Sequence, residues 1–535
     1  MSSPFVVFAG GAMRTNKVLE NLGTVCRFIL ALSAVAFSPA VVAHGFRQRY
    51  DLPIPLGLWV IGAGATIVLS FVIIGLVDHD HRTATTYSRV NLLRVGLVRG
   101  LAHWLPLGAA RLLAVIFLVA TVLAGFAGDQ DPFSNLAPVM VWVIWWVGVA
   151  FVCALIGDLW ALINPFRTIF SWAEWIFFRL TSGGQLSLAR PYPPNLAMWP
   201  AVAGLLIFFW AELIWADGTV PENIAVAIVI YALVTWAGMF VYGRDVWLQN
   251  ADTFSIVFGI LARFAPLELR VANDKALINS CAIPVCRGKT KDCVNGYHCL
   301  IRAASDRWEW NLRPPALGLL NDQRVTFSMM VLVIVLLATV TFDGLLETRL
   351  WTHVLDRTLT GEIRSVGSVA LVLFSGGFLL IYLFFCGLMR QFAKRYGDSN
   401  RVDQQKTTLE LASLFVLTLV PIAIAYHLAH YVSFLLITGQ YVIPLISDPL
   451  GYRWDLFGTA HYQVDTDLLS ARVAWYLAVS FVVLGHVYAV YLAHVVAGRI
   501  FGSGHGAFLS QIPMVLLMVL YTMASLWILA QPMVA

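Results

Sequence analysis

Residues 326–343 read TFSMMVLVIVLLATVTFD, an apolar run in which the only charged residue is the last one, Asp343. An uninterrupted run of about 18 or more apolar residues predicts a transmembrane helix. Comparable runs lie near 57–77, 107–127, 136–156, 196–216, 222–242, 366–389, 409–438, 472–495 and 511–531. The sequence therefore predicts an all-α, polytopic helical membrane protein with about ten transmembrane helices.

The composition supports the same class. The chain has 535 residues, of which 59% are hydrophobic and 12% charged, whereas soluble domains carry about 25% charged residues. So few charges cannot cover a globular surface, which excludes a soluble enzyme, a disordered chain, a fibrous chain and a coiled coil. The net charge of +5 does not require a nucleic-acid partner. The positive residues are concentrated in a few loops, where they indicate which side of the membrane each loop occupies.

The charges of the loops alternate along the chain. Lys and Arg are concentrated in 81–100, 157–195, 243–325 and 390–408, while 128–135 and 217–222 carry acidic residues. The positive-inside rule then places the basic loops in the cytoplasm and both mature termini in the periplasm of a bacterial inner membrane. We expect a first five-helix part over 44–242, a cytoplasmic loop over 243–325 and a second five-helix part over 326–535.

The N-terminus is typical of a signal peptide. Arg14, Lys17 and Arg27 precede the apolar run 28–42, which is short for a span and ends in small residues before His44. We expect residues 1–43 to be cleaved, with a retained anchor as the alternative. Cleavage would leave His44 with a free amine beside its imidazole, a pair that can chelate a metal, copper in particular. Otherwise His44 is an ordinary periplasmic residue.

Four cysteines cluster in the predicted cytoplasmic loop: Cys281, Cys286, Cys293 and Cys299. Disulfides are disfavoured in that compartment, and thiolates at short spacing suit zinc or an iron–sulfur cluster. A closed set of four ligands would form a structural metal site. Disulfides and unligated thiols are the alternatives.

Ionisable residues inside the predicted spans point to a functional site, because they are costly in hydrocarbon. His427 and His430 lie three residues apart and so share a helix face, and His486 lies in the next span. We predict these three as ligands of a divalent transition metal, Zn or Cu, with His44 as an additional ligand. Asp448 and Asp455, in the outer loop between the two spans, would act as ligand or general base. Asp343 is either a further ligand or a helix cap. Helix-bridging hydrogen bonds and haem ligation are the alternative roles for the histidines.

Several short stretches resemble a bacterial membrane-protein family known as fenitrothion hydrolases. The resemblance extends over most of the chain and rests on AHGF at 43–46 with RYDLPIP at 49–55, NPFR at 164–167, LARFAPL at 261–267, FDG at 342–344, HLAHY at 427–431, SDP at 447–449, WDLFG at 454–458 and GH at 485–486. It implies that the chain hydrolyses an uncharged, lipophilic organophosphorus triester to a nitrophenol and a dialkyl thiophosphate. A metal could activate the attacking water, and Trp454 and Tyr431 could stack on the aromatic leaving group.

Two hypotheses follow. In the first, the chain is a metal-assisted phosphotriesterase of the inner membrane whose site opens to the periplasm, with membrane lipid and a lipophilic organophosphate as its partners. In the second, it is a transition-metal permease or metal-handling protein, and the same histidines form a transport site. A haem-binding redox protein is a third, weaker reading. The sequence does not define the oligomeric state.

Overall fold

A computed structural model describes residues 52, 54–77, 89–104, 107–271, 308–320, 325–358, 362–396, 406–502 and 505–534. The predicted signal peptide, His44 and the four clustered cysteines lie outside these ranges, so their predicted roles stay predictions.

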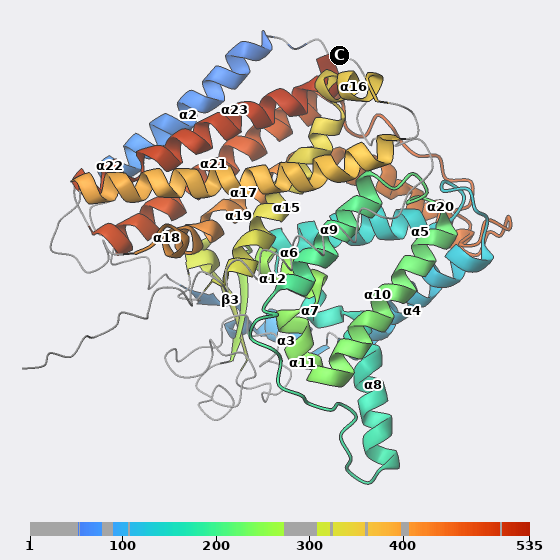
Figure 1. Cartoon of the computed structure of the whole chain (residues 1–535). Coiled ribbons are helices and arrows are strands. Elements are labelled where there is room, and N and C mark those ends of the chain that lie inside the picture. Colours follow the sequence, from blue (N-terminus) through green and yellow to red (C-terminus); the bar gives the residue numbers. More distant parts are fainter. Residues whose placement is uncertain are drawn as a thin grey trace, which may run out of the picture.

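The chain is overwhelmingly helical, which confirms the predicted class (Figure 1). The helices before the large loop are α2 (Leu56–Val77), α3 (Gly96–Trp104), α4 (Leu107–Ala127), α5 (Leu136–Pro138), the π-helix η3 (Val139–Val149), α6 (Ala150–Leu155), α7 (Leu159–Ile163), α8 (Pro165–Leu180), α9 (Trp199–Leu213), α10 (Pro221–Tyr242), α11 (Arg244–Asn250) and α12 (Thr253–Leu261). Those after it are α15 (Phe327–Leu346), α16 (Arg349–Asp356), α17 (Ile363–Tyr396), α18 (Thr408–Phe415), η9 (Val416–Leu419), α19 (Val420–Thr438), η10 (Gly439–Tyr441), α20 (Val442–Ser447), α21 (Ala471–Phe501), α22 (His505–Ser510) and α23 (Ile512–Val534).

Each of the ten predicted runs is helical, and within the described ranges nine helices are long and apolar enough to cross a membrane. The run at 196–216 differs, because its helix α9 has only 15 residues. At about 1.5 Å per residue this helix is some 22 Å long, which is shorter than a hydrocarbon core of about 30 Å. The helix starts with Pro200 in its first turn and ends at Leu213, just beyond the acidic side chain of Glu212.

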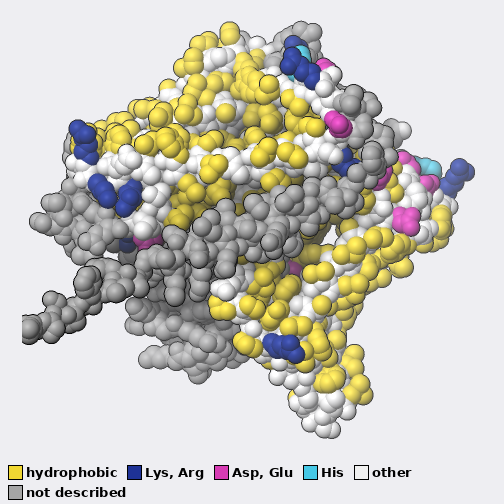
Figure 2. Space-filling model, in the orientation of Figure 1, with side chains coloured by type: hydrophobic (Ala, Val, Ile, Leu, Met, Phe, Trp, Pro, Cys, Tyr) yellow, Lys and Arg dark blue, Asp and Glu magenta, His cyan; other side chains and the backbone are white. Residues whose placement is uncertain are grey.

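The spans differ sharply in burial. In the most apolar stretch of α15, 89% of the residues are buried inside the protein. The buried share of the corresponding stretch is 17% in α4 and 22% in α2 and α17. Helix α15 is therefore the centre of the fold, and the other three turn apolar side chains outward. Figure 2 shows these hydrophobic side chains as a broad surface, with charged residues at its margins. Such a surface fits a lipid environment.

The C-terminal helices pack closely around the site described below. Gly485 on α21 lies against α19, where a Cβ atom at this position would collide with Ala425 and lie 2.8 Å from the carbonyl oxygen of Pro421. Helix α2 lies against α21 and α23, and the rings of Trp59 and Trp475 meet edge to face at 6.0 Å. The start of α2 and the end of α23 consequently lie at the same end of the bundle (Figure 1).

A small antiparallel sheet is the main departure from the all-helical prediction. Strands β1 (Val90–Asn91), β3 (Trp308–Leu312) and β2 (Leu267–Val271) pair in that order, with Leu267 opposite Leu312 and Val271 opposite Trp308. The β2 sequence LELRV alternates apolar and charged residues, the period expected of a half-buried strand. Since these strands come from the predicted basic loops, the sheet lies outside the apolar helices.

Candidate functional site

The centre of the candidate site is a carboxylate–imidazole pair between α15 and α19. The Nε2 atom of His430 donates a hydrogen bond to Oδ2 of Asp343 at 2.8 Å, and the Tyr431 hydroxyl donates to the same oxygen at 2.6 Å. The side chains of Asp343 and His430 are 5% and 10% exposed. Because Nε2 carries the donated proton, Nδ1 is the ring nitrogen that can accept another. Asp343, which the sequence left open as ligand or cap, is therefore the partner that orients His430.

His427 faces different neighbours. The Tyr431 ring contacts both histidines, with its centroid 4.7 Å from that of each imidazole, and the two histidines also interact electrostatically. His427 instead meets Trp146 of η3 at 5.4 Å and Phe151 of α6 at 5.5 Å. The two histidines lie on adjoining parts of α19, but their rings turn to different side chains.

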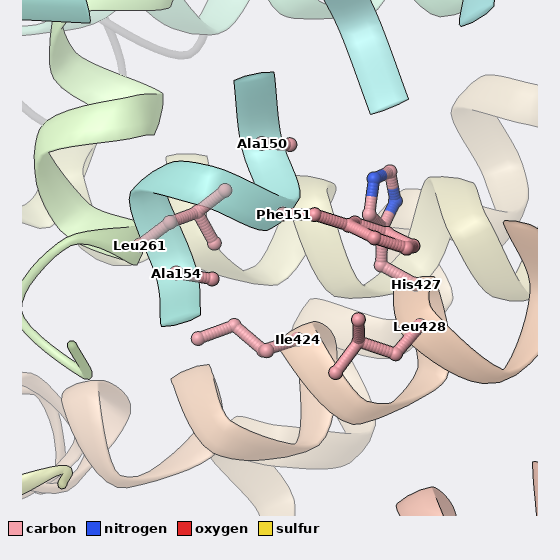
Figure 3. A pocket seen from close by; sticks show the side chains of 7 residues that line it. All are labelled: Ala150, Phe151, Ala154, Leu261, Ile424, His427 and Leu428. Atoms are coloured by element: carbon pink, nitrogen blue, oxygen red, sulfur yellow. The ribbon is translucent and has the colours of Figure 1, made fainter. Parts of the chain in front are cut away.

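A small cavity adjoins His427. Figure 3 shows its lining, in which His427 is the one polar side chain among Ala150, Phe151, Ala154, Leu261, Ile424 and Leu428. The cavity volume is about 10 Å³, roughly the space that one water molecule needs. The Nε2 atom of His427 is buried and, among the residues described, has no hydrogen-bond partner. The exposed lining is apolar, so the cavity borders carbon atoms of the His427 ring, and its unused Nε2 atom points elsewhere.

His486 occupies a neighbouring position on α21. Its Nδ1 hydrogen-bonds the carbonyl of Val482 at 2.8 Å, its ring lies 5.8 Å from that of Tyr521, and its Nε2 has no partner in the described ranges. The Tyr521 hydroxyl in turn hydrogen-bonds Thr341 on α15. In the part of the chain described, no hydrogen bond, ion pair or ring contact joins His486 to His427 or His430.

Glu212 on α9 also belongs to this region, although neither its spacing nor a motif marked it in the sequence. Its carboxylate interacts electrostatically with Asp343 and Tyr431, and its Oε2 is buried without a hydrogen-bond partner in the described structure. A signal was nevertheless present, since an acidic residue within an apolar run is a default functional candidate. The site therefore contains two carboxylates close enough to interact electrostatically.

Asp448 and Asp455, predicted as ligand or general base, each accept hydrogen bonds from nearby backbone amides. Asp448 accepts hydrogen bonds from the backbone amides of Tyr452 and Arg453 at 2.9 and 2.6 Å, and Asp455 accepts one from Ala460 at 3.0 Å. These contacts fold the loop between α20 and α21 on itself. No contact within the described ranges links either aspartate to the histidines, so the fold offers a structural role for both.

The predicted metal ligands can be compared with this geometry. Donors of the right kind are present in His427, His430, His486 and Asp343, but among the residues described no three His, Cys, Asp or Glu side chains gather as a metal site. Within the described ranges His430 pairs with Asp343, and His427 interacts electrostatically with both of them. Metal binding by the predicted set stays a prediction. The predicted structural site at Cys281, Cys286, Cys293 and Cys299 lies outside the described residues.

A second buried polar cluster lies in the N-terminal half, around the NPFR stretch. Asn164 caps α8 and donates to Ser255 of α12 at 3.3 Å, while Arg167 pairs with Asp245 at 3.3 Å. Asp158 caps α7, and burial raises its pKa to about 6. The polar groups named here satisfy one another across helix ends, an arrangement that serves packing.

The arrangement as a whole can transfer a proton. An imidazole oriented by a carboxylate, with one ring nitrogen available, is the usual form of a general base. A water molecule taken up beside it would be activated in a low-dielectric setting. No protein family, curated protein or solved structure matches the chain.

Proposed function

We propose that the chain is an integral-membrane hydrolase of organophosphorus triesters, in which His430 is the general base and Asp343 orients it. The observation that carries the proposal is the hydrogen bond of 2.8 Å between His430 Nε2 and Asp343 Oδ2, deep among apolar helices. The fenitrothion hydrolase resemblance supplies the substrate class, and the pair supplies a means to activate water.

The reaction would proceed by attack of water on phosphorus. As the water oxygen bonds to phosphorus, its proton passes to Nδ1 of His430, and the bond from phosphorus to the aryl oxygen breaks. The nitrophenoxide leaves with the electron pair, and a dialkyl thiophosphate remains. Asp343 stabilises the imidazolium that forms, and the hydrogen bond from Tyr431 holds the carboxylate in place.

The location suits such a substrate. A neutral triester partitions into the bilayer and would approach the helices from the lipid, so the protein needs no large aqueous cavity for delivery. Burial also strengthens the electrostatic interaction between the imidazolium and Asp343. The proposed location is the bacterial inner membrane, with the pair nearer the periplasmic side.

The predicted divalent ion requires a separate test. None of the steps above passes through such an ion, because no three candidate donors gather within the described ranges. Chelator-treated membranes would be supplied with Zn or Cu one at a time while nitrophenol release is followed. Activity that disappears and returns with one metal would add that metal to the mechanism. If chelation does not change the activity, the mechanism needs no metal: His430 accepts the proton and Asp343 stabilises the resulting imidazolium.

The decisive experiment compares His430→Ala with His353→Ala. His353 lies exposed on α16, so its replacement is a matched control for losing an imidazole. We expect His430→Ala to reduce fenitrothion hydrolysis by about 10²–10⁴-fold, the usual contribution of general-base catalysis. His353→Ala should remain near wild type. If both variants hydrolyse the triester at the wild-type rate, or if the wild-type protein does not hydrolyse it, the proposal fails.

A transition-metal permease is the second candidate, and one observation favours it. His427 and His486 each keep a buried Nε2 atom without a hydrogen-bond partner among the described residues, and such atoms are suited to bind a passing metal ion. Uptake of zinc or copper by proteoliposomes would then depend on both histidines. Uptake unchanged in a His427→Ala, His486→Ala double variant would dismiss this function.

A further inference from the structure

Arg263, which follows α12, is a buried cation that has no anionic partner within the described part of the chain. The residue is only 7% exposed, and its Nε atom is buried without a hydrogen bond. Within the described ranges its guanidinium group forms neither an ion pair nor a hydrogen bond, and its charged neighbour is another arginine, Arg313. Buried charges in proteins are normally paired, so this exception requires an explanation.

Arg313 is itself a cation, and its carboxylate partner in the described structure is Glu268. It donates to Glu268 at 3.0 Å and to the backbone carbonyls of Arg263 and Ala265 at 3.0 and 3.2 Å. The other carboxylate oxygen of Glu268 is taken by Arg89 at 2.8 Å. Within the described ranges Glu268 therefore contacts Arg313 and Arg89, and no carboxylate pairs with Arg263.

The backbone is shaped to hold the two arginines together. Gly318, in the 3₁₀-helix η6 (Leu317–Leu320), lies so close that a Cβ atom there would collide with the Arg313 guanidinium and with the Arg263 carbonyl. Burial and the neighbouring Arg313 lower the pKa of Arg263 to about 10. Arg263 therefore keeps its charge at neutral pH.

We propose that Arg263, together with the positive charge of Arg313, binds a phosphate-type anion at this end of the protein. A guanidinium has donors but no acceptors, and its fork matches the oxygens of a phosphate group. The site adjoins the small sheet, on the face that the charge pattern predicts to be cytoplasmic. Two sources share this chemistry there: the headgroup of an anionic phospholipid and free inorganic phosphate.

The test uses the full-length protein in nanodiscs and follows its thermal unfolding. One arm adds inorganic phosphate to phosphatidylcholine nanodiscs, with chloride at equal ionic strength as reference. The other replaces phosphatidylcholine by phosphatidylglycerol without added phosphate. We expect at least one arm to raise the Tm of the wild type, because a ligand that binds the native state stabilises it. Stabilisation in the first arm identifies free phosphate, and stabilisation in the second identifies the lipid headgroup.

The Arg263→Gln variant should lose this increase, with affinity for the anion reduced at least about tenfold. Arg94→Gln is the matched control, because Arg94 is exposed in a basic segment predicted to be cytoplasmic. If Arg263→Gln does not fold, binding of radiolabelled phosphate and of phosphatidylglycerol to the wild type decides the matter. No stabilisation or binding in the wild type, or equal stabilisation of the wild type and Arg263→Gln, would overturn the proposal.

Discussion

Asp343→Asn is the most specific perturbation of the candidate site, because it replaces one carboxylate oxygen by an NH₂ group and keeps the shape of the side chain. In the wild type, Oδ2 of Asp343 accepts from both His430 and Tyr431. An asparagine presents either its NH₂ group, which cannot accept from either donor, or a neutral carbonyl oxygen. The negative charge that would stabilise the His430 imidazolium is lost in both orientations.

The size of the effect follows from these contacts. A hydrogen bond to a charged group contributes roughly 1.5–3 kcal/mol, and a neutral one roughly 0.5–1.5 kcal/mol. Two charge-assisted bonds replaced by neutral ones therefore lose about 2–3 kcal/mol in the ground state. The transition state loses more, because it also contains the imidazolium. Only this additional transition-state loss lowers kcat. A carboxylate-to-amide change beside a general-base histidine can lower kcat by about 10⁴-fold, and we expect a fall of at least about 10²-fold for fenitrothion.

The assay measures initial rates of nitrophenol release by purified protein in nanodiscs, with Asp343→Asn, His430→Ala and the double variant in parallel. Two residues that act as one unit give a double variant hardly slower than either single variant. If the rate loss of the double variant equals the product of the two single losses, Asp343 and His430 act independently. A kcat for Asp343→Asn within about twofold of wild type would refute the assignment of Asp343.

Three further outcomes are expected. Tyr431→Phe removes the second donor to Asp343 and should lower kcat about tenfold in the same assay, without changing the amount of protein in the membrane. The raised pKa of Asp158 means that the folded protein binds an extra proton between about pH 4 and 6. The unfolding free energy should therefore fall by about 3 kcal/mol as pH rises through that window; Asp158→Asn should flatten this slope in thermal unfolding, and an unchanged slope would contradict the assignment. Gly485→Ala forces a methyl group against α19 and should destabilise the protein by about 1–3 kcal/mol, whereas Gly57→Ala, with open space around it, should leave the Tm unchanged.

The fold could be predicted from the sequence because the length of an apolar run is a local property. The site could be predicted only in part. Spacing marked His430 as an intramembrane candidate, which stays a prediction, but the rotation of a helix about its axis depends on its neighbours. For that reason the spacing could not show that His427 contacts Trp146 and Phe151, whereas His430 pairs with Asp343. The partner of His430 is Asp343, 87 positions earlier in the chain, and only the packing of α15 against α19 brings the two together.

The polar atoms that lack partners within the described structure argue that this region does more than join helices. Tyr426, His427, His486 and Glu212 each keep a buried oxygen or nitrogen without a hydrogen bond. Every such atom costs about 1–3 kcal/mol, and apolar side chains of similar size would avoid that cost. Helix bridging explains the hydrogen bond from His430 to Asp343 but not these four atoms around it. A bound water, substrate or ion could use these atoms, and the reaction centre proposed at the Asp343–His430 pair would supply such a molecule.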